Sequence, residues 1–215
     1  DSLDFQLVRA RLRAQEDSAQ DAVLAARRVL DEKRYNSETA ARYGLVTALI
    51  RARQFRDAET EAQKLPSGKT GSPMIQLLLA RTALAAGKQT LALQRYQAGS
   101  HAYPGYRPLQ YGYISALLTA GRNNDAQTQV EGQLALYPLD RRLWRLAAQT
   151  HAQLGHRLLG HRAQAEAAAL SGNLVAAIEQ ITLGIKAGDG SFHEMSAAEA
   201  RRREWQEIEK SQRKN

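Results

Sequence analysis

Apolar residues recur along most of the chain every three or four positions, which is the spacing of a helix that buries one face. Near the amino terminus this pattern comprises Leu3, Leu7, Val8 and Leu12. It predicts a first helix over residues 3–15. Asp17-Ser18 then supplies a capping side chain for a second helix that extends to Leu30, and Ser37-Glu38 opens a third. The pattern therefore predicts an all-α fold.

Between Gly71 and Gly155 the sequence also repeats itself with a fixed step. Glycine recurs at positions 87, 121 and 155, a step of 34, each time between an apolar and a basic residue. Because a left-handed glycine commonly follows a helix, Gly87, Gly121 and Gly155 are expected in turns between helices. Other positions keep the same step: Leu84 and Leu118, Ala92 and Ala126, and Tyr103-Pro104 and Tyr137-Pro138. The small alanines let two helices approach closely, and the prolines end each repeat.

This step, together with its turn glycine, resembles the tetratricopeptide repeat (TPR), in which each repeat is one helix-turn-helix unit. The resemblance implies a right-handed α-solenoid of about six repeats with a carboxyl-terminal capping helix, forming a single domain over residues 1–215. Arg53 stands one such step before Gly87, so its turn is predicted to be a repeat boundary that has lost its glycine. The predicted repeats are 1–35, 36–70, 71–105, 106–139 and 140–171, then an overlapping repeat at 157–188 and a loop with the capping helix at 189–215.

The overlap arises because the period halves after Gly155. Gly172 follows after only half the usual step and marks another turn between helices. One helix, at about 157–170, is therefore predicted to close the fifth repeat and to open a sixth, whose second helix spans 174–186. Ser196-Ala197-Ala198-Glu199 has the form of a capping box and is predicted to start the final helix.

Composition and charge bound the possible functions without selecting one. The absence of cysteine excludes disulfides and thiolate zinc sites but leaves cytosol and periplasm both open. No apolar run approaches the length of a membrane helix. The net charge is +8, of which residues 71–155 contribute +5 through 8 Lys/Arg against 3 Asp/Glu. This excess indicates either a solvated basic surface or a groove that attracts acidic or carbonyl-rich polypeptide. Because the chain begins with Asp1 rather than Met, we expect it to be part of a longer protein.

Motifs for nucleotide or nucleic-acid binding are incomplete. Gly68-Lys69-Thr70 resembles part of a phosphate-binding loop, but position 63 is Gln rather than Gly, and Gly71-Ser72-Pro73 stands where a helix must follow. Several tyrosines lie in or near the basic region: Tyr96, Tyr103, Tyr106, Tyr111, Tyr113 and Tyr137. Core packing explains most of them, and the arginines are scattered over several faces, so nucleic-acid binding is not predicted.

Motifs for metal binding and catalysis are incomplete as well. His151, His156 and His161 stand five residues apart, whereas metal-binding histidines on one helix face stand four apart. His193-Glu194 resembles half of the HExxH zinc-protease motif, but position 197 is Ala. We therefore expect no catalytic residue, metal or cofactor in this chain.

In TPR proteins the first helix of each repeat lines a concave groove. Phasing on the glycines places eleven residues there: Tyr43, Thr47 and Arg51 from the second repeat, Leu77 and Arg81 from the third, Tyr111, Ser115 and Leu118 from the fourth, and Arg142, Arg145 and Gln149 from the fifth. Arginine and tyrosine side chains suit extended backbone and carboxylates. The Lys/Asn clamp of chaperone-adaptor TPR domains is not matched, because no asparagine stands at these positions. The expected partners are proteins or extended peptides.

The carboxyl-terminal third carries a more specific resemblance. It rests on His151-Ala-Gln-Leu-Gly155, His161-Arg-Ala-Gln-Ala-Glu-Ala, Gly172-Asn-Leu, Ala177-Ile-Glu-Gln, Gly188-Asp and Ala198-Glu-Ala-Arg-Arg. Over roughly residues 140–210 the chain resembles the end of bacterial periplasmic HExxH zinc metalloproteases of the β-barrel assembly-enhancing (BepA) type. In that family a catalytic domain precedes a TPR domain, so no catalytic residue is carried over and any zinc belongs to the parent's protease domain.

The resemblance implies a periplasmic domain that recruits clients or assembly machinery to a zinc metalloprotease acting in outer-membrane protein assembly and quality control. The alternative is a free-standing TPR scaffold, or one with another parent, that serves envelope assembly or secretion without a protease. An upstream HExxH motif and signal peptide in the parent reading frame would favour the first hypothesis.

Overall fold

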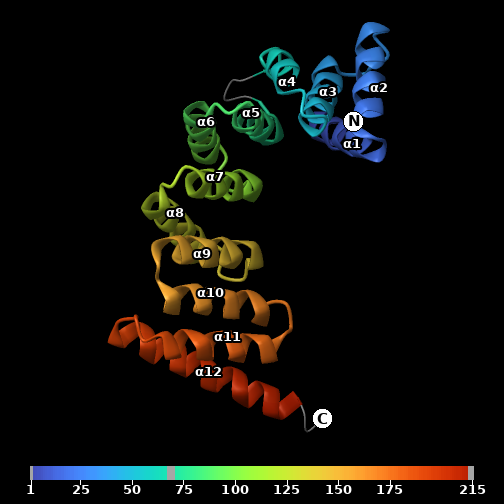
Figure 1. Cartoon of the computed structure of the whole chain (residues 1–215). Coiled ribbons are helices and arrows are strands. Elements are labelled where there is room, and N and C mark those ends of the chain that lie inside the picture. Colours follow the sequence, from blue (N-terminus) through green and yellow to red (C-terminus); the bar gives the residue numbers. More distant parts are fainter. Residues whose placement is uncertain (1, 67–70, 213–215) are drawn as a thin grey trace. The chain divides into compact units, whose positions relative to one another are not determined.

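The computed structural model describes residues 2–66 and 71–212, and every helix or strand in these ranges is an α-helix (Figure 1). The helices are α1 (Leu3–Glu16), α2 (Ala19–Asp31), α3 (Glu38–Arg51), α4 (Phe55–Ala62), α5 (Pro73–Ala85), α6 (Gln89–Ala102), α7 (Arg107–Thr119), α8 (Asn123–Leu136), α9 (Arg141–Leu154), α10 (Arg157–Ala169), α11 (Leu174–Ala187) and α12 (Phe192–Gln212). The predicted all-α fold is confirmed. Within the described ranges no helix combines the length and apolarity needed to cross a membrane.

The chain divides into two compact units, residues 1–116 and 117–215. In the first unit, successive odd-numbered helices share a core. Leu7 of α1, Val46 of α3 and Ile75 of α5 are completely buried in one cluster. A second cluster joins the even-numbered helices to this core through Val23 of α2 and Ala58 of α4. The first helices of three successive repeats therefore lie side by side.

The turns between paired helices share one backbone arrangement. Gly87, Gly121, Gly155 and Gly172 all have φ between +70° and +79°, the left-handed region that glycine adopts without a steric penalty. After each of these glycines the next residue donates its N–H to a carbonyl five positions back, as from Lys88 to Ala83 at 2.9 Å. This bond satisfies a carbonyl at the helix end.

Arg53 takes the same place after α3. Its φ is +59°, and Gln54 donates to the Leu49 carbonyl at 2.9 Å, as Lys88 does to Ala83. The repeat boundary that the fixed step placed at Arg53 thus keeps the glycine conformation without the glycine.

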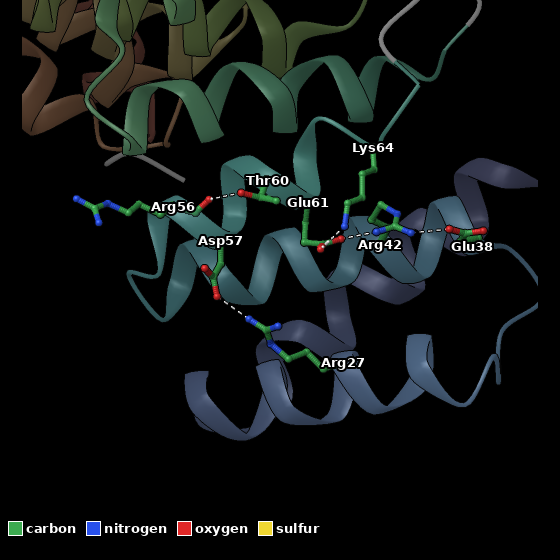
Figure 2. A network of polar contacts seen from close by, with 8 residues as sticks. All are labelled: Arg27, Glu38, Arg42, Arg56, Asp57, Thr60, Glu61 and Lys64. Carbon is green, nitrogen blue, oxygen red and sulfur yellow. Dashed lines mark hydrogen bonds and ion pairs between the residues drawn. The ribbon is translucent and has the colours of Figure 1, made fainter.

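Ion pairs connect α2, α3 and α4 in the first unit (Figure 2). Arg42 of α3 bridges Glu38 on its own helix and Glu61 on α4, and Glu61 also accepts from Lys64 at 2.7 Å. Arg27 of α2 reaches Asp57 of α4 at 2.6 Å. Arg42 and Glu61 are largely shielded from solvent, so their bridge contributes more than an exposed pair would.

In the second unit the long helix α12 covers a core made by α10 and α11. Ile181, Ala198 and Trp205 are almost fully buried there. Arg201 anchors the helix by donating two 2.9 Å hydrogen bonds to the carboxylate of Glu166 on α10, and its guanidinium lies 4.8 Å from the Trp205 ring centroid. A forked, charge-assisted pair of this kind fixes orientation as well as position.

The sequence-based start of this last helix is wrong. We predicted a capping box at Ser196–Glu199, but the helix is capped five residues earlier, at Ser191, and α12 begins at Phe192. Ser191 and Glu194 form the capping box instead: the Ser191 N–H donates to the Glu194 carboxylate at 2.7 Å, and the Glu194 N–H donates to Ser191 Oγ at 3.3 Å. The earlier start adds Met195 to the apolar stripe that packs on the core.

Candidate protein-binding groove

A cavity of about 240 Å³ lies in the first unit, where the first helices of three successive repeats meet. Its walls are Arg11 and Gln15 of α1, Tyr43, Thr47, Ile50 and Arg51 of α3, and Leu77, Leu78 and Arg81 of α5. We call this the groove cavity. Its lining contains three arginines and neither Asp nor Glu, so it is basic. Ile50, Leu77 and Leu78 supply its apolar lining, which we call the apolar base.

Helical spacing explains how these residues meet. Tyr43, Thr47 and Arg51 stand four residues apart and therefore follow one another along a single face of α3. Leu77 and Arg81 do the same on α5. The step of 34 connects the two helices, since it leads from Tyr43 to Leu77 and from Thr47 to Arg81. All five residues that the sequence assigned to the second and third repeats line the groove cavity.

Tyr43 places a buried phenol beside the basic side chains. Only 4% of its surface is exposed. Burial raises the pKa of Tyr43, the neighbouring Arg11 and Arg81 lower it, and Tyr106 raises it. The net effect is upward, so Tyr43 stays neutral at physiological pH and can donate a hydrogen bond.

Arg51 has a structural role in addition to its place in the lining. Its guanidinium donates to the carbonyls of Ala14 at 2.8 Å and Asp17 at 2.5 Å, at the carboxyl-terminal end of α1. These carbonyls lack partners within their own helix, and a cation also complements the negative end of the helix dipole. Arg51 therefore joins α3 to α1, and its capacity to bind a further ligand is reduced.

Arg11 and Arg81 differ from Arg51 in this respect. In the described part of the chain neither side chain forms an ion pair or a hydrogen bond with another residue. The nearby Asp4, whose charge acts on Tyr106, accepts a hydrogen bond from Ser72 Oγ at 2.6 Å. The groove cavity thus presents two cations without an ion-pair partner among the described residues.

The sequence reasoning missed Arg11 and Gln15. A step of 34 back from Tyr43 and Thr47 leads to Arg9 and Arg13, which line a different cavity, between α1, α2 and α3. The two helices of the first repeat are joined by Asp17-Ser18, with extended backbone at Asp17, rather than by a left-handed glycine turn. Without that landmark the period could not be phased on the first repeat.

The remaining residues assigned to the groove lie on α7 and α9. Tyr111 of α7 is buried, with 8% of its surface exposed, whereas Ser115 is exposed. Leu118 of α7 is half-buried. On α9 three residues lie exposed along the helix: Arg142, Arg145 and Gln149. That these residues continue the groove of the first unit stays a prediction.

The sequence motifs judged incomplete for catalysis or metal binding form no such site in the described residues. Glu194 of the partial HExxH motif is engaged in the α12 capping box. His161 contacts Gln180 at 2.9 Å, and the rings of His151 and His156 lie 5.9 Å apart. In the ranges the structure describes, no three His, Cys, Asp or Glu residues are placed to hold a metal ion. Gly68-Lys69-Thr70 lies outside the described residues.

Comparison with solved structures agrees with the TPR-like fold. "MamA 41-end from Desulfovibrio magneticus RS-1" matches with a TM-score of 0.56 and 15% identity, over 82% of this chain and 98% of that one. A MamA RS-1 ArsTM double mutant matches with a TM-score of 0.56 and 14% identity, over 84% and 99%. No protein-family profile and no curated protein sequence matches the chain. The TPR-like α-solenoid fold is confirmed, and the BepA-type origin stays a prediction.

Proposed function

We propose that this chain is a TPR-like protein-interaction domain whose groove cavity holds an extended segment of a client protein. The observation that carries the proposal is the lining of that cavity by the first helices of three successive repeats. In it Arg11 and Arg81, which have no ion-pair partner among the described residues, lie beside the apolar base. Extended peptide backbone offers carbonyls to arginine, and apolar side chains of a client gain from contact with the base.

We further propose that the domain serves a periplasmic zinc metalloprotease that acts in outer-membrane protein assembly and quality control. The likeness of residues 140–210 to BepA-type proteases supports this proposal. In it the protease domain, with its zinc, precedes this chain in the parent protein, and the clients include outer-membrane β-barrel proteins and their assembly machinery.

A scaffold without a protease is the second candidate. The favouring observation is that this fold matches 98% and 99% of the two solved MamA chains, so those chains consist almost entirely of TPR-like repeats. Reading the parent gene upstream of Asp1 separates the candidates. An HExxH-containing domain behind a signal peptide supports the protease, and its absence supports a scaffold in envelope assembly or secretion.

Site-specific photo-crosslinking tests the interaction function. Thr47, in the groove cavity, and Thr60, exposed on α4, would each be replaced by p-benzoylphenylalanine in otherwise identical chains. After incubation with envelope extract, the crosslinked proteins would be identified by mass spectrometry. Each crosslink would then be repeated with the purified partner protein. We expect a defined protein product from position 47 that is lost in Arg81→Glu. Equal products from both positions would contradict a groove function.

A further inference from the structure

We infer that the cavity between α1, α2 and α3 binds the alkyl chain of a small amphiphile whose anionic head group lies at Arg9 and Arg13. This cavity has a volume of about 200 Å³ and shares no lining residue with the groove cavity. We call it the alanine cavity, because alanines line it on all three helices: Ala10 and Ala14 of α1, Ala22 and Ala26 of α2, and Ala40 and Ala41 of α3. The inference goes beyond the proposed function, which concerns protein clients.

The repeat shows that a larger apolar side chain is missing here. From Ala41 of α3 the step of 34 leads to three residues that are completely buried: Ile75 of α5, Leu109 of α7 and Leu143 of α9. Ile75 packs in a core cluster with Ala62 of α4, which belongs to the preceding helix pair. Ala41 likewise faces the preceding pair, since it lines the cavity together with α1 and α2, but it is only half-buried. An apolar ligand would therefore occupy volume that later repeats fill with their own side chains.

The volume of the alanine cavity defines the apolar part of the ligand. An apolar protein cavity of about 150 Å³ binds benzene, which has six carbon atoms. On the same scale, the volume of about 200 Å³ accommodates about eight carbon atoms. Moving an alkyl chain of this length from water to apolar walls is favourable.

Two arginines define the charge of the head group. Arg9 and Arg13 stand four residues apart on α1, so their side chains are neighbours. Among the described residues neither has an ion-pair or hydrogen-bond partner, and none that lines the cavity is Asp or Glu. Like charges at this spacing repel each other, and an anion between them offsets the repulsion. A carboxylate and a phosphate monoester share this chemistry, so either can be the head group.

NMR titration of the ¹³C,¹⁵N-labelled full chain with eight-carbon probes tests this inference. Octanoate and octyl phosphate carry the two anionic head groups, and octyl glucoside carries the same chain without a charge. The readout is the methyl signals of Ala22 and Ala41 in the cavity lining. We expect saturable shifts of both signals with at least one anionic probe, and intermolecular NOEs from its alkyl chain to both methyl groups.

Variants separate the alkyl chain from the head group. Ala41→Leu gives α3 the residue that α7 and α9 carry at this position, so it should fill the cavity and abolish binding without lowering the melting temperature. Arg9→Gln/Arg13→Gln should raise the Kd of the anionic probe by about fivefold. Arg28→Gln/Arg56→Gln is the matched control, because it removes two exposed charges outside the lining and should leave Kd unchanged.

The length of the alkyl chain provides a second measurement. Each buried methylene strengthens binding by about fourfold, so octanoate should bind about 15-fold more tightly than hexanoate. Dodecanoate should bind little more tightly than octanoate, because its additional carbons extend beyond the cavity. A gain that continued undiminished to dodecanoate would contradict a cavity of this size.

Three further results would overturn the inference. The first is no saturable methyl shift with either anionic probe, and the second is binding that persists in Ala41→Leu. The third is equal affinity for octyl glucoside, because the arginines would then contribute nothing. If binding is found, the tighter anionic probe identifies the head group. The wild-type titration and its NOEs decide the matter even where a variant melts early.

Discussion

At the scale of single residues, Arg53 adopts a backbone conformation that the later repeats give to glycine. Its φ of +59° lies in the left-handed region, where an L-residue with a Cβ is disfavoured. The side chain is exposed and no described contact requires it. The repeat geometry is thus imposed on Arg53 by the hydrogen bonds that end α3.

Replacing this residue should therefore stabilise the protein. We expect Arg53→Gly to raise the free energy of unfolding by about 0.5–1 kcal/mol, since relief of the left-handed strain exceeds the added flexibility of the unfolded chain. Arg53→Ala, which removes the side chain but keeps the strain, should give no gain. Urea denaturation of the three proteins measures the difference, and equal effects of Gly and Ala would show that the backbone is not strained.

His151 links stability to pH. Burial lowers its pKa below the ordinary 6.5, assisted by His156 and Arg162 and opposed by Glu131 and Glu194. Its Nδ1 atom is buried without a hydrogen-bond partner in the described chain. Above pH 6.5 the histidine is neutral in both folded and unfolded states. Below that value the unfolded chain takes up the proton first, so the folded state loses stability as pH falls towards the lowered pKa.

Removing this titration should flatten the acid side of the stability curve. When the pH is lowered from about 7.5 to about 5.5, the melting temperature of His151→Leu should fall less than that of the wild type. His101→Leu, at an exposed position on α6, should lose as much as the wild type. Calorimetry at the two pH values provides the test, and parallel losses in all three proteins would contradict a neutral buried His151.

At the scale of helices, one glycine inside α11 is required for close packing, whereas one inside α8 only lowers helix propensity. A Cβ added at Gly184 of α11 would lie 3.1 Å from the Leu158 carbonyl oxygen and 3.0 Å from the His161 Cβ. A Cβ at Gly132 of α8 would meet nothing within 4 Å. The first glycine lets α11 approach α10, whereas the second has no such role.

Alanine at the two positions should have opposite effects. Gly184→Ala should lower the free energy of unfolding by about 1–3 kcal/mol. The added methyl group would clash with the Leu158 carbonyl oxygen and the His161 Cβ, which can move away only if the backbone of α10 shifts. Gly132→Ala should raise it by up to about 1 kcal/mol through helix propensity. Both lie in the second unit, so one denaturation assay compares them. If Gly132→Ala lowered the free energy of unfolding as much as Gly184→Ala, the contact of α11 with α10 would not explain the effect at Gly184.

The helices illustrate how far local sequence information extends. The fixed step predicted the turns at Gly87 and Gly155 because the left-handed conformation is a local requirement. A capping box is also local, but Ser191 and Glu194 have the same spacing as the predicted pair, Ser196 and Glu199, and the structure uses the earlier pair. Asp189 could not have been predicted: it accepts from the N–H groups of Arg157 and Leu158 at 2.6 and 2.9 Å, and so caps α10 from 31 to 32 residues away.

The candidate groove shows the same limit. The positions of Tyr43 and Arg81 in the groove could be predicted from the step of 34, because regular helix pairs produce that step. Arg11 does not, because the first repeat lacks the glycine turn from which to count. The sequence also could not show that Arg51 is committed to the end of α1, since its carbonyl partners lie 34 and 37 residues away.

At the scale of the whole molecule, the net charge of +8 acts on folding and on binding in opposite directions. Repulsion among like charges destabilises a compact chain, and salt screens that repulsion. The same salt also screens attraction between the exposed arginines and a carboxylate-bearing client. The Debye length falls from about 30 Å at 0.01 M to about 8 Å at 0.15 M, so both effects should change markedly over this range.

We therefore expect added NaCl to raise the melting temperature while it weakens client crosslinking at position 47. Each exposed charge contact contributes only about 0.2–1 kcal/mol, so binding should decline gradually as the contacts weaken together. In the Arg11→Gln/Arg81→Gln double variant the residual crosslinking should depend little on salt, because the two unpaired cations of the groove cavity are gone. Melting curves and crosslinking yields at about 0.01 M and about 0.15 M salt measure both responses. A wild-type yield that does not fall with salt would mean that the client is held by the apolar base of the groove rather than by its arginines.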